Sequence, residues 1–302
     1  MSAEIRFFEV GPRDGLQNEE AILAPADRVT MIEKLVATGV RDIEIGSFVH
    51  PSWVPQMADT EQVAAQLQRQ PGVRYWALVP NLKGLERALA ADIDHVAVFM
   101  SATESHNRKN LNRSLKQSVA SVDEVMQRAT AEGMTVRAYL STAFGCPFEG
   151  DVDFDQVLAI GEHLLEEGAE HLSLGDTIGA GSPAQIRQGC RRAISAFGDA
   201  HVALHLHDTQ GLALVNAMVA LEEGVRFFDG AVAGMGGCPY APGAAGNVAS
   251  EDLLNLFEQL NAQSTVDLDA LCGVSRWVQE ELGFCGGGRY LAYWQAQRQR
   301  GE

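Results

Sequence analysis

The sequence predicts an α/β fold, a (β/α)₈ barrel of the TIM type, and three observations favour it. Eight short apolar runs recur along the 302 residues, as expected of parallel strands that are buried on both faces. Amphipathic stretches separate these runs. No Gly-x-Gly-x-x-Gly motif follows the first run, which disfavours a doubly wound sheet. The predicted strands lie at about 5–10, 42–48, 75–80, 95–100, 135–142, 171–175, 202–207 and 226–232.

The helices predicted between the strands have recognisable ends. The stretches 27–38, 81–91 and 155–167 carry apolar residues at helical spacing. Glycine favours the left-handed backbone that ends many helices, and four glycines stand where helices should end: Gly39, Gly133, Gly168 and Gly224. The periodicity weakens from about residue 270. We therefore expect one domain over 1–302 that ends in a short helical appendage.

Composition and charge exclude several classes of function. Hydrophobic residues make up 46% of the chain, yet no run approaches the roughly 18 apolar residues of a membrane span. The formal net charge of −17 argues against nucleic acid and anionic membranes as partners. The first ten residues resemble a strand and lack the pattern of a targeting segment. We therefore expect a cytoplasmic protein whose partner is a small molecule.

The five cysteines are widely spaced and form no Cys-x-x-Cys pair, so neither a zinc ribbon nor a disulfide framework is indicated. We expect reduced, mostly buried thiols at Cys146, Cys190, Cys238, Cys272 and Cys285. Cys238 differs because glycines precede and follow it, as in loops that close over a site. It is a candidate for proton transfer, whereas Cys146 is expected to be structural.

A metal site is predicted at the ends of the strands. His205 and His207 are two residues apart on a strand, so both imidazoles point to the same face, towards the barrel mouth. A lone histidine would more often be a core residue. Asp14 adds a carboxylate and Asn247 an amide oxygen, although either could cap a turn instead. Imidazoles with oxygen ligands and no thiolate suit Mg²⁺ or Mn²⁺, while zinc and iron stay open.

Two basic features complete the predicted site. Arg13 is a candidate to neutralise the oxygen of an enolate, and an ion pair with Glu44 that only braces the barrel is the structural alternative. A basic and polar cluster at 107–113 follows the fourth strand. In a chain this acidic, the cluster is a candidate for binding the phosphates of a nucleotide-tailed ligand. A solvated helix face explains it equally well.

These residues belong to longer segments that resemble the 3-hydroxy-3-methylglutaryl-CoA lyases, within a superfamily of metal-dependent TIM-barrel lyases and Claisen-type synthases. The resemblance covers about residues 5–260. The short pieces at 13–17 (RDGLQ) and 205–208 (HLHD) are shared with the synthases, whereas Gly-Cys-Pro-Tyr at 237–240 is specific to the lyases. The matching segments lie at 10–19, 47–59, 80–84, 173–181, 205–211 and 233–253.

The resemblance implies roles for individual residues. The metal ligands that it implies are Asp14, His205, His207 and Asn247. The catalytic residues that it implies are Arg13, Asp14, Glu44, Asp176 and Cys238. It further implies that the CoA portion of an acyl-CoA contacts Lys109 and Asn110. The resemblance also implies a divalent metal (Mg²⁺ or Mn²⁺) and a homo-oligomer (dimer or tetramer). It further implies a place in leucine degradation or ketone-body metabolism.

The implied reaction is a retro-Claisen cleavage of 3-hydroxy-3-methylglutaryl-CoA to acetyl-CoA and acetoacetate. Asp14 or a neighbour would remove the hydroxyl proton, Arg13 would hold the enolate oxygen, and Cys238 would return a proton to carbon. Glu20 replaces the family's lysine, His50 replaces its serine, and the organellar C-terminal cysteine motif is missing. A lyase for a related 3-hydroxyacyl-CoA therefore stays an alternative. An isopropylmalate- or homocitrate-type synthase and a non-catalytic metal- or CoA-binding protein are less favoured.

Overall fold

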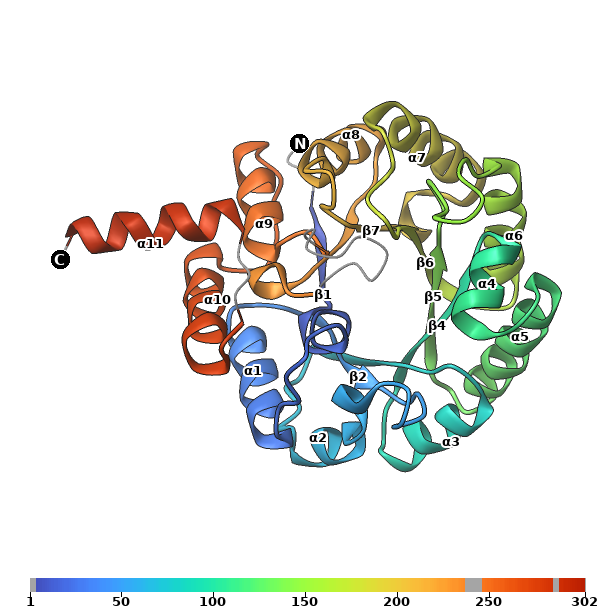
Figure 1. The fold of residues 1–302 in the computed structure, drawn as a ribbon, viewed down its shortest axis with the longest axis horizontal. Helices are drawn as coiled ribbons and strands as arrows, with labels where there is room; N and C mark the ends of the chain where they lie inside the picture. The colour runs from blue at the N-terminus through green and yellow to red at the C-terminus, as the bar shows by residue number, and fades with distance from the viewer. Residues whose placement is uncertain (1–3, 237–245, 285–287, 302) are drawn as a thin grey trace.

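The computed structural model describes residues 4–236, 246–284 and 288–301 and confirms the predicted barrel. Eight parallel strands follow one another in chain order, and the barrel closes because β1 pairs with both β2 and β8. The helices surround this barrel (Figure 1). The strands are β1 (Arg6–Glu9), β2 (Asp42–Ser47), β3 (Arg74–Leu78), β4 (His95–Ser101), β5 (Thr135–Ser141), β6 (Ala169–Asp176), β7 (Val202–Leu206) and β8 (Phe227–Gly230).

The predicted helices 27–38, 81–91 and 155–167 correspond to α1, α3 and α6, and all four glycines expected at helix ends have positive φ. None of the described helices is long and apolar enough to cross a membrane. The helices are α1 (Pro25–Ala37), α2 (Thr60–Gln66), α3 (Leu82–Ala90), α4 (Glu104–Leu111), α5 (Leu115–Ala131), α6 (Phe154–Glu166), α7 (Pro183–Phe197), α8 (Ala213–Glu223), α9 (Ser250–Gln259), α10 (Leu268–Leu282) and α11 (Arg289–Gly301).

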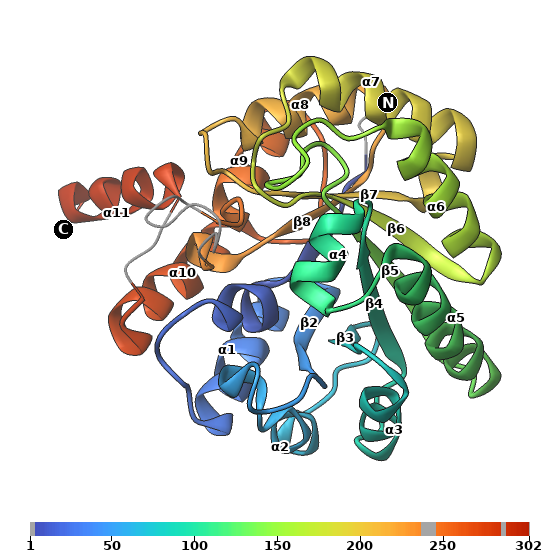
Figure 2. The same ribbon diagram turned by 45° about the vertical axis from the view of Figure 1, so that its right-hand side comes forward.

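The eighth strand and the C-terminal end depart in detail from the expectation. β8 ends at Gly230, two residues before the predicted end, because the chain then turns through Val232–Gly234, where Ala233 has a left-handed backbone with φ 56°. The expected helical appendage is present as α10 and α11, and α11 extends away from the barrel (Figures 1 and 2). The Asp252 carboxylate accepts from the Arg289 and Tyr290 amides at 3.0 and 2.7 Å and thereby fixes the start of α11.

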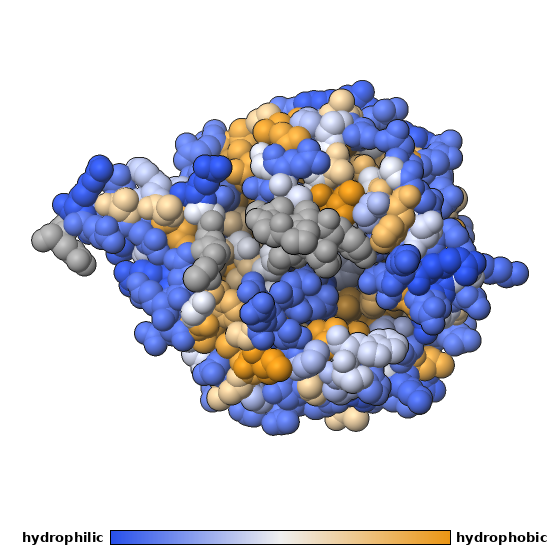
Figure 3. All heavy atoms as spheres, viewed as in Figure 1, coloured by the Kyte–Doolittle hydropathy of each residue, from blue (hydrophilic) through white to orange (hydrophobic). Residues whose placement is uncertain are grey.

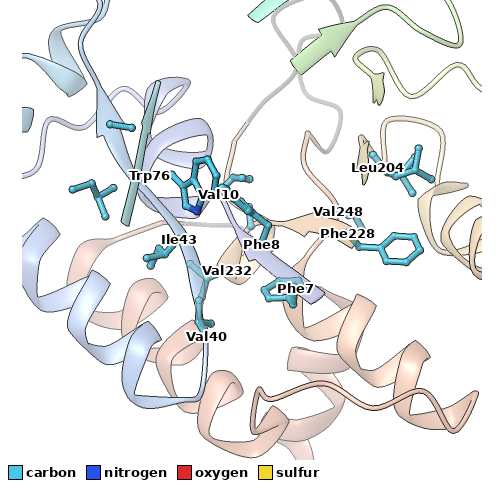
Figure 4. Packing of buried hydrophobic residues seen from close by; sticks show 14 of the residues in the cluster. Phe7, Phe8, Val10, Val40, Ile43, Trp76, Leu204, Phe228, Val232 and Val248 are labelled. Atoms are coloured by element: carbon cyan, nitrogen blue, oxygen red, sulfur yellow. The ribbon is translucent and has the colours of Figure 1, made fainter. Parts of the chain in front are cut away.

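Large apolar side chains fill the interior between the strands and the surrounding helices. Phe8 and Trp76 are both buried and pack with ring centroids 5.7 Å apart (Figure 4). The Trp76 indole donates to the Asp42 carboxylate at 2.9 Å, so its polar group is satisfied inside the core. This packing gives the strand ends a rigid base, and side chains at those ends are held in fixed relative positions.

The described cysteines fit the expectation of buried, reduced thiols. Cys146, Cys190 and Cys272 are buried and free. Burial raises the pKa of Cys190 and of Cys272 to about 12, which keeps both thiols protonated and unreactive. Cys238 and Cys285 lie outside the described residues.

Candidate metal centre and active site

The carboxyl ends of the strands surround one pocket of about 540 Å³. Figure 3 looks onto this face of the molecule, whose surface is hollowed near its centre. In a barrel of parallel strands all carboxyl ends meet at one rim, so side chains distant in the sequence converge there. The lining includes Arg13, Asp14, Val49, Trp53, Val54, Leu78, Phe99, Lys109, Asn110, Arg113, Tyr139, Ser173, His205 and His207.

The predicted pair of histidines meets Asp14 on one side of this pocket. His205 Nε2 lies 3.3 Å from His207 Nε2 and 3.7 Å from Asp14 Oδ2. One ligand atom from each of the three residues lies within 4.8 Å of the other two. A single cation placed between these atoms can therefore contact all three side chains.

Asn247 supplies a fourth possible ligand, an amide oxygen, beside this cluster. Its Nδ2 donates to Asp14 Oδ2 at 2.9 Å and to the Met235 carbonyl at 3.2 Å. Its Oδ1 is buried and has no hydrogen-bond partner among the described residues. A buried amide oxygen without a partner is costly, and a divalent cation would satisfy it. The donor set of one carboxylate, one amide oxygen and two imidazoles therefore fits a divalent metal.

The charge states of these groups also suit metal binding. Burial disfavours the imidazolium form of His207, and the neighbouring His205 disfavours it further, so the pKa of His207 falls to about 4. Burial alone would raise the pKa of Asp14, but Arg13 and the two histidines outweigh it and hold that pKa well below its ordinary value. A neutral imidazole and an ionised carboxylate are the forms that bind metals. A lowered pKa makes the Asp14 carboxylate a weaker base, so these charges favour Asp14 as a ligand over Asp14 as the base.

Arg13 is fixed between two carboxylates at the pocket wall. Its Nε donates to Glu44 Oε2 at 2.6 Å, and its Nη1 donates to Asp14 Oδ1. Glu44 is fully buried and also accepts from the Tyr139 hydroxyl at 3.2 Å. The ion pair that the sequence suggested is thus present, and it holds the guanidinium of a residue that lines the pocket. Bracing and substrate binding are compatible at this position.

Asp176 is placed differently from the other predicted catalytic residues. It is fully buried at the end of β6, and its carboxylate accepts from the Ala180 amide at 3.0 Å and the Gly181 amide at 3.1 Å. Its neighbours Gly175 and Thr177 line the pocket. The structure therefore uses the Asp176 carboxylate to shape the loop between β6 and α7, and does not place it in the Asp14–His205–His207 cluster.

The predicted CoA contacts lie on α4 at the rim. Lys109 and Asn110 are exposed, and both line the pocket together with Arg113. The basic cluster is thus at once an exposed helix face and a pocket wall, and its binding of CoA phosphates stays a prediction. Cys238 lies outside the described residues, and its predicted part in proton transfer stays a prediction.

Sequence reasoning assigned no role to two acidic residues inside the barrel. Asp229 lies on β8, where its Oδ2 is 3.2 Å from Nδ1 of His205. Glu9 lies on β1 and is fully buried. Each follows two phenylalanines within a predicted strand, as Phe-Phe-Asp and Phe-Phe-Glu. A charge in a strand buried on both faces is the signal that could have identified them.

Comparison with known proteins agrees with this geometry. The HMGL-like family model matches residues 4–278. The hydroxymethylglutaryl-CoA lyase YngG of Bacillus subtilis is 48% identical, with 93% of this chain and 94% of the relative covered. A 3-hydroxy-3-isohexenylglutaryl-CoA/hydroxy-methylglutaryl-CoA lyase of Pseudomonas aeruginosa is 44% identical, with 95% of each chain covered.

A solved structure shows the same likeness in three dimensions. The crystal structure of hydroxymethylglutaryl-CoA lyase from Pseudomonas aeruginosa superposes with a TM-score of 0.96 at 43% sequence identity. The match covers 98% of this chain and 99% of that one. With a family match over most of its length, and with relatives this similar over nearly their whole length, the chain belongs to the HMGL-like family.

Proposed function

We propose that this chain is a carbon–carbon lyase that cleaves 3-hydroxy-3-methylglutaryl-CoA to acetyl-CoA and acetoacetate. The observation that carries the proposal is the cluster of Asp14, His205 and His207 beside Arg13 in one pocket. The relatives named as hydroxymethylglutaryl-CoA lyases support it, because they align over nearly the whole chain.

The ligands proposed for the metal are Asp14, His205, His207 and Asn247, and Mg²⁺ or Mn²⁺ suits them. When bound, the metal supplies Lewis acidity to the oxygens of the substrate. Arg13 is held by Glu44 and Asp14, so its guanidinium enters the reaction already oriented. Such a fixed donor stabilises the negative charge that develops on a thioester oxygen as the carbon–carbon bond breaks.

Two proton transfers complete the reaction. A base must remove the proton of the tertiary hydroxyl, and an acid must protonate the carbon of the acetyl-CoA enolate. We propose Cys238 for the second transfer. Replacing it by serine should abolish most turnover and leave Mn²⁺ binding unchanged. An active Cys238→Ser enzyme would remove the thiol from the mechanism.

We also propose that the rim of the pocket binds the CoA portion of the substrate. Lys109 and Arg113 give the rim positive charge in a chain of net charge −17, which suits the phosphates of CoA. A cytoplasmic location, a homo-oligomer and a single domain over 1–302 stay predictions.

The direct test is incubation of the protein with 3-hydroxy-3-methylglutaryl-CoA and Mg²⁺ or Mn²⁺, with both products followed by mass spectrometry. We expect acetyl-CoA and acetoacetate in equal amounts, and no product after a chelator is added. His207→Ala is a suitable control because it removes one proposed ligand. Product formation that persists in the chelator would overturn the metal-dependent reaction.

A second candidate is a lyase of the same mechanism for a bulkier 3-hydroxyacyl-CoA. Apolar side chains form part of the pocket wall at Val49, Val54, Leu78 and Phe99. The Pseudomonas aeruginosa relative is named for a substrate with an isohexenyl group. A panel of thioesters that differ only in the substituent at C3 would distinguish the two candidates by their ratios of kcat/KM. If the protein instead condensed acetyl-CoA with a keto acid and cleaved none of the 3-hydroxyacyl-CoA thioesters in the panel, it would be a Claisen-type synthase.

A further inference from the structure

A buried arginine inside the barrel is connected to the proposed metal ligands through an aspartate. Arg137 on β5 is 1% exposed, and its guanidinium carbon lies 3.9 Å from the ring centre of Phe8 and 4.7 Å from that of Tyr139. Its Nη2 donates to Asp229 Oδ1 at 2.5 Å. Its Nε and Nη1 have no hydrogen-bond partner among the described residues. The guanidinium thus lies within cation–π distance of two rings, with Asp229 as its hydrogen-bonded partner.

The second oxygen of Asp229 faces the metal centre. Asp229 Oδ2 lies 3.2 Å from His205 Nδ1 and accepts from the Ser173 hydroxyl, also at 3.2 Å. His205 and Asp229 are partners in the register of the neighbouring strands β7 and β8, which fixes their separation. Arg137, Asp229 and His205 therefore form one continuous chain from the interior of the barrel to the ligand cluster.

We propose that Arg137 and Asp229 are positioning residues that orient His205 for the metal. The bond from Arg137 to one oxygen of Asp229 fixes the plane of the carboxylate, so the other oxygen meets His205 Nδ1. A carboxylate only accepts hydrogen bonds, so Nδ1 carries the proton and Nε2 presents its lone pair. His205 Nε2 is the atom that faces Asp14 and His207.

A purely stabilising role explains this arrangement poorly. Removing two charges from water costs as much as a buried ion pair usually returns, unless further hydrogen bonds satisfy both partners. Here two nitrogens of Arg137 have no partner among the described residues. The guanidinium is thus poorly satisfied as a stabilising group, whereas the second carboxylate oxygen of Asp229 lies where it orients His205.

The inference rests on the metal site proposed above and is independent of the acyl substrate. The test is a titration of metal-free protein with Mn²⁺ in the absence of any thioester. The electron paramagnetic resonance signal of unbound Mn²⁺ gives the dissociation constant. The variants are Asp229→Asn, Arg137→Met and Arg137→Lys. The matched control is Asp42→Asn, because Asp42 is also a buried aspartate paired with an arginine, Arg74, at 2.7 Å, and contacts no ligand.

We expect Asp229→Asn and Arg137→Met to weaken Mn²⁺ binding about 10- to 100-fold, as is usual when the partner of a ligating histidine is lost. Arg137→Lys should recover much of the affinity, and Asp42→Asn should bind like the wild type. Ser173→Ala removes only the hydroxyl bond to Asp229 and leaves both charges in place. It should weaken binding about threefold and provides a test if the harsher variants do not fold.

Equal Mn²⁺ affinity in Asp229→Asn and Asp42→Asn, at similar melting temperature, would overturn the inference. If Asp229→Asn and Arg137→Met fail to fold, the inference would be overturned by wild-type Mn²⁺ affinity in both Ser173→Ala and Arg137→Lys. Wild-type protein that binds no Mn²⁺ would overturn both this inference and the proposed metal site. Mn²⁺ binding that depends on Asp229, without cleavage of 3-hydroxy-3-methylglutaryl-CoA, would support the inference and overturn only the proposed substrate.

Discussion

At the scale of single residues, the barrel interior contains charges that a core optimised only for stability would lack. Arg13, Glu44, Arg137 and Asp229 are all at least 95% buried, and each has an oppositely charged partner. Ion pairs in such places seldom add stability over apolar packing, so their value lies in fixed geometry. Glu9 differs, because it is buried among hydrogen-bond donors and no cation in the described part of the chain pairs with it.

Glu9 connects the end of β1 to the segment that follows β8. Its Oε1 accepts from the Gly11 amide at 2.7 Å and the Val232 amide at 2.9 Å. Its Oε2 accepts from the Ser250 hydroxyl at 2.7 Å. Burial raises the pKa of Glu9 from 4.5 to about 7, although these hydrogen bonds oppose the change.

The variant Glu9→Gln should change how the stability of the protein depends on pH. The folded protein binds the proton of the Glu9 carboxyl group more tightly than the unfolded chain does. The contribution of Glu9 to the free energy of unfolding is therefore complete below pH 4.5 and is lost as the pH rises through about 7. The loss amounts to about 3 kcal/mol. Glutamine can satisfy the same partners without a charge, so the variant should lose less stability than the wild type between pH 5 and 8. Urea unfolding in a chelator at several pH values measures this. Exposed Glu86→Gln serves as the control, and an unchanged slope in Glu9→Gln would contradict the prediction.

Arg13→Lys tests whether the shape of the guanidinium matters as well as its charge. Arg13 reaches Glu44 and Asp14 with two different nitrogens, which a single ammonium group cannot reproduce. We expect kcat to fall about 10²- to 10³-fold, as when a fixed donor to a developing oxyanion is lost. Circular dichroism should show an unchanged fold. Steady-state kinetics at saturating Mn²⁺ makes the measurement, and a kcat within a factor of three of the wild type would refute the role.

At the scale of secondary-structure elements, the loops after the strands decide which side chains reach the pocket. The loop between β6 and α7 is held by Asp176, whose carboxylate binds the amides of Ala180 and Gly181. Helix α7 then begins with a capping box formed by Ser182 and Gln185. The direction of Thr177 into the pocket thus depends on hydrogen bonds outside the pocket.

Asp176→Ala should therefore act through the loop. Two backbone amides would lose their acceptor, at a cost of about 1–3 kcal/mol in the free energy of unfolding. We expect KM for the thioester to rise because the pocket wall shifts, while Mn²⁺ affinity stays close to that of the wild type. Ser182→Ala is the control, since it loosens the start of α7 without touching Asp176. A large loss of Mn²⁺ affinity in Asp176→Ala would instead place the carboxylate at the metal.

The elements were largely predictable from the sequence, because buried parallel strands and amphipathic helices leave strong periodic patterns. The pairing of His205 with His207 followed from strand geometry, and Asp14 and Arg13 followed from their place after β1. The hydrogen bonds of the Asp176 carboxylate could not be predicted, since loop hydrogen bonds such as that to Gly181 depend on backbone coordinates. The orientation of Asp229 towards His205 depends on strand register, which local sequence does not encode.

At the scale of the whole molecule, the metal centre joins the two ends of the barrel. Asp14 follows the first strand, Asn247 follows the last, and they contact each other across 233 positions of sequence. His205 and His207 come from β7 and its end. A cation bound here would link segments that separate when the barrel opens, so its binding free energy should contribute to folding stability.

Metal addition should therefore raise the melting temperature. At a metal concentration of about 100 times the dissociation constant, the stabilisation is about 2.7 kcal/mol, which corresponds to roughly 4 °C for a chain of 302 residues. Differential scanning calorimetry with Mn²⁺ and with a chelator measures the shift. His207→Ala should show little of it. An equal shift in His207→Ala would mean that the metal acts somewhere else on the protein.

The exposure of Trp53 has a practical consequence for optical measurements. Trp53 lies at the pocket wall with 77% of its surface exposed, whereas Trp76 is fully buried and Trp294 is 8% exposed. Acrylamide in solution should quench the fluorescence of Trp53 more than that of the buried indoles. A thioester that fills the pocket should protect Trp53 from the quencher, and Trp53→Phe should abolish that protection. The chain thus contains its own fluorescent reporter of ligand binding, which needs neither turnover nor a label.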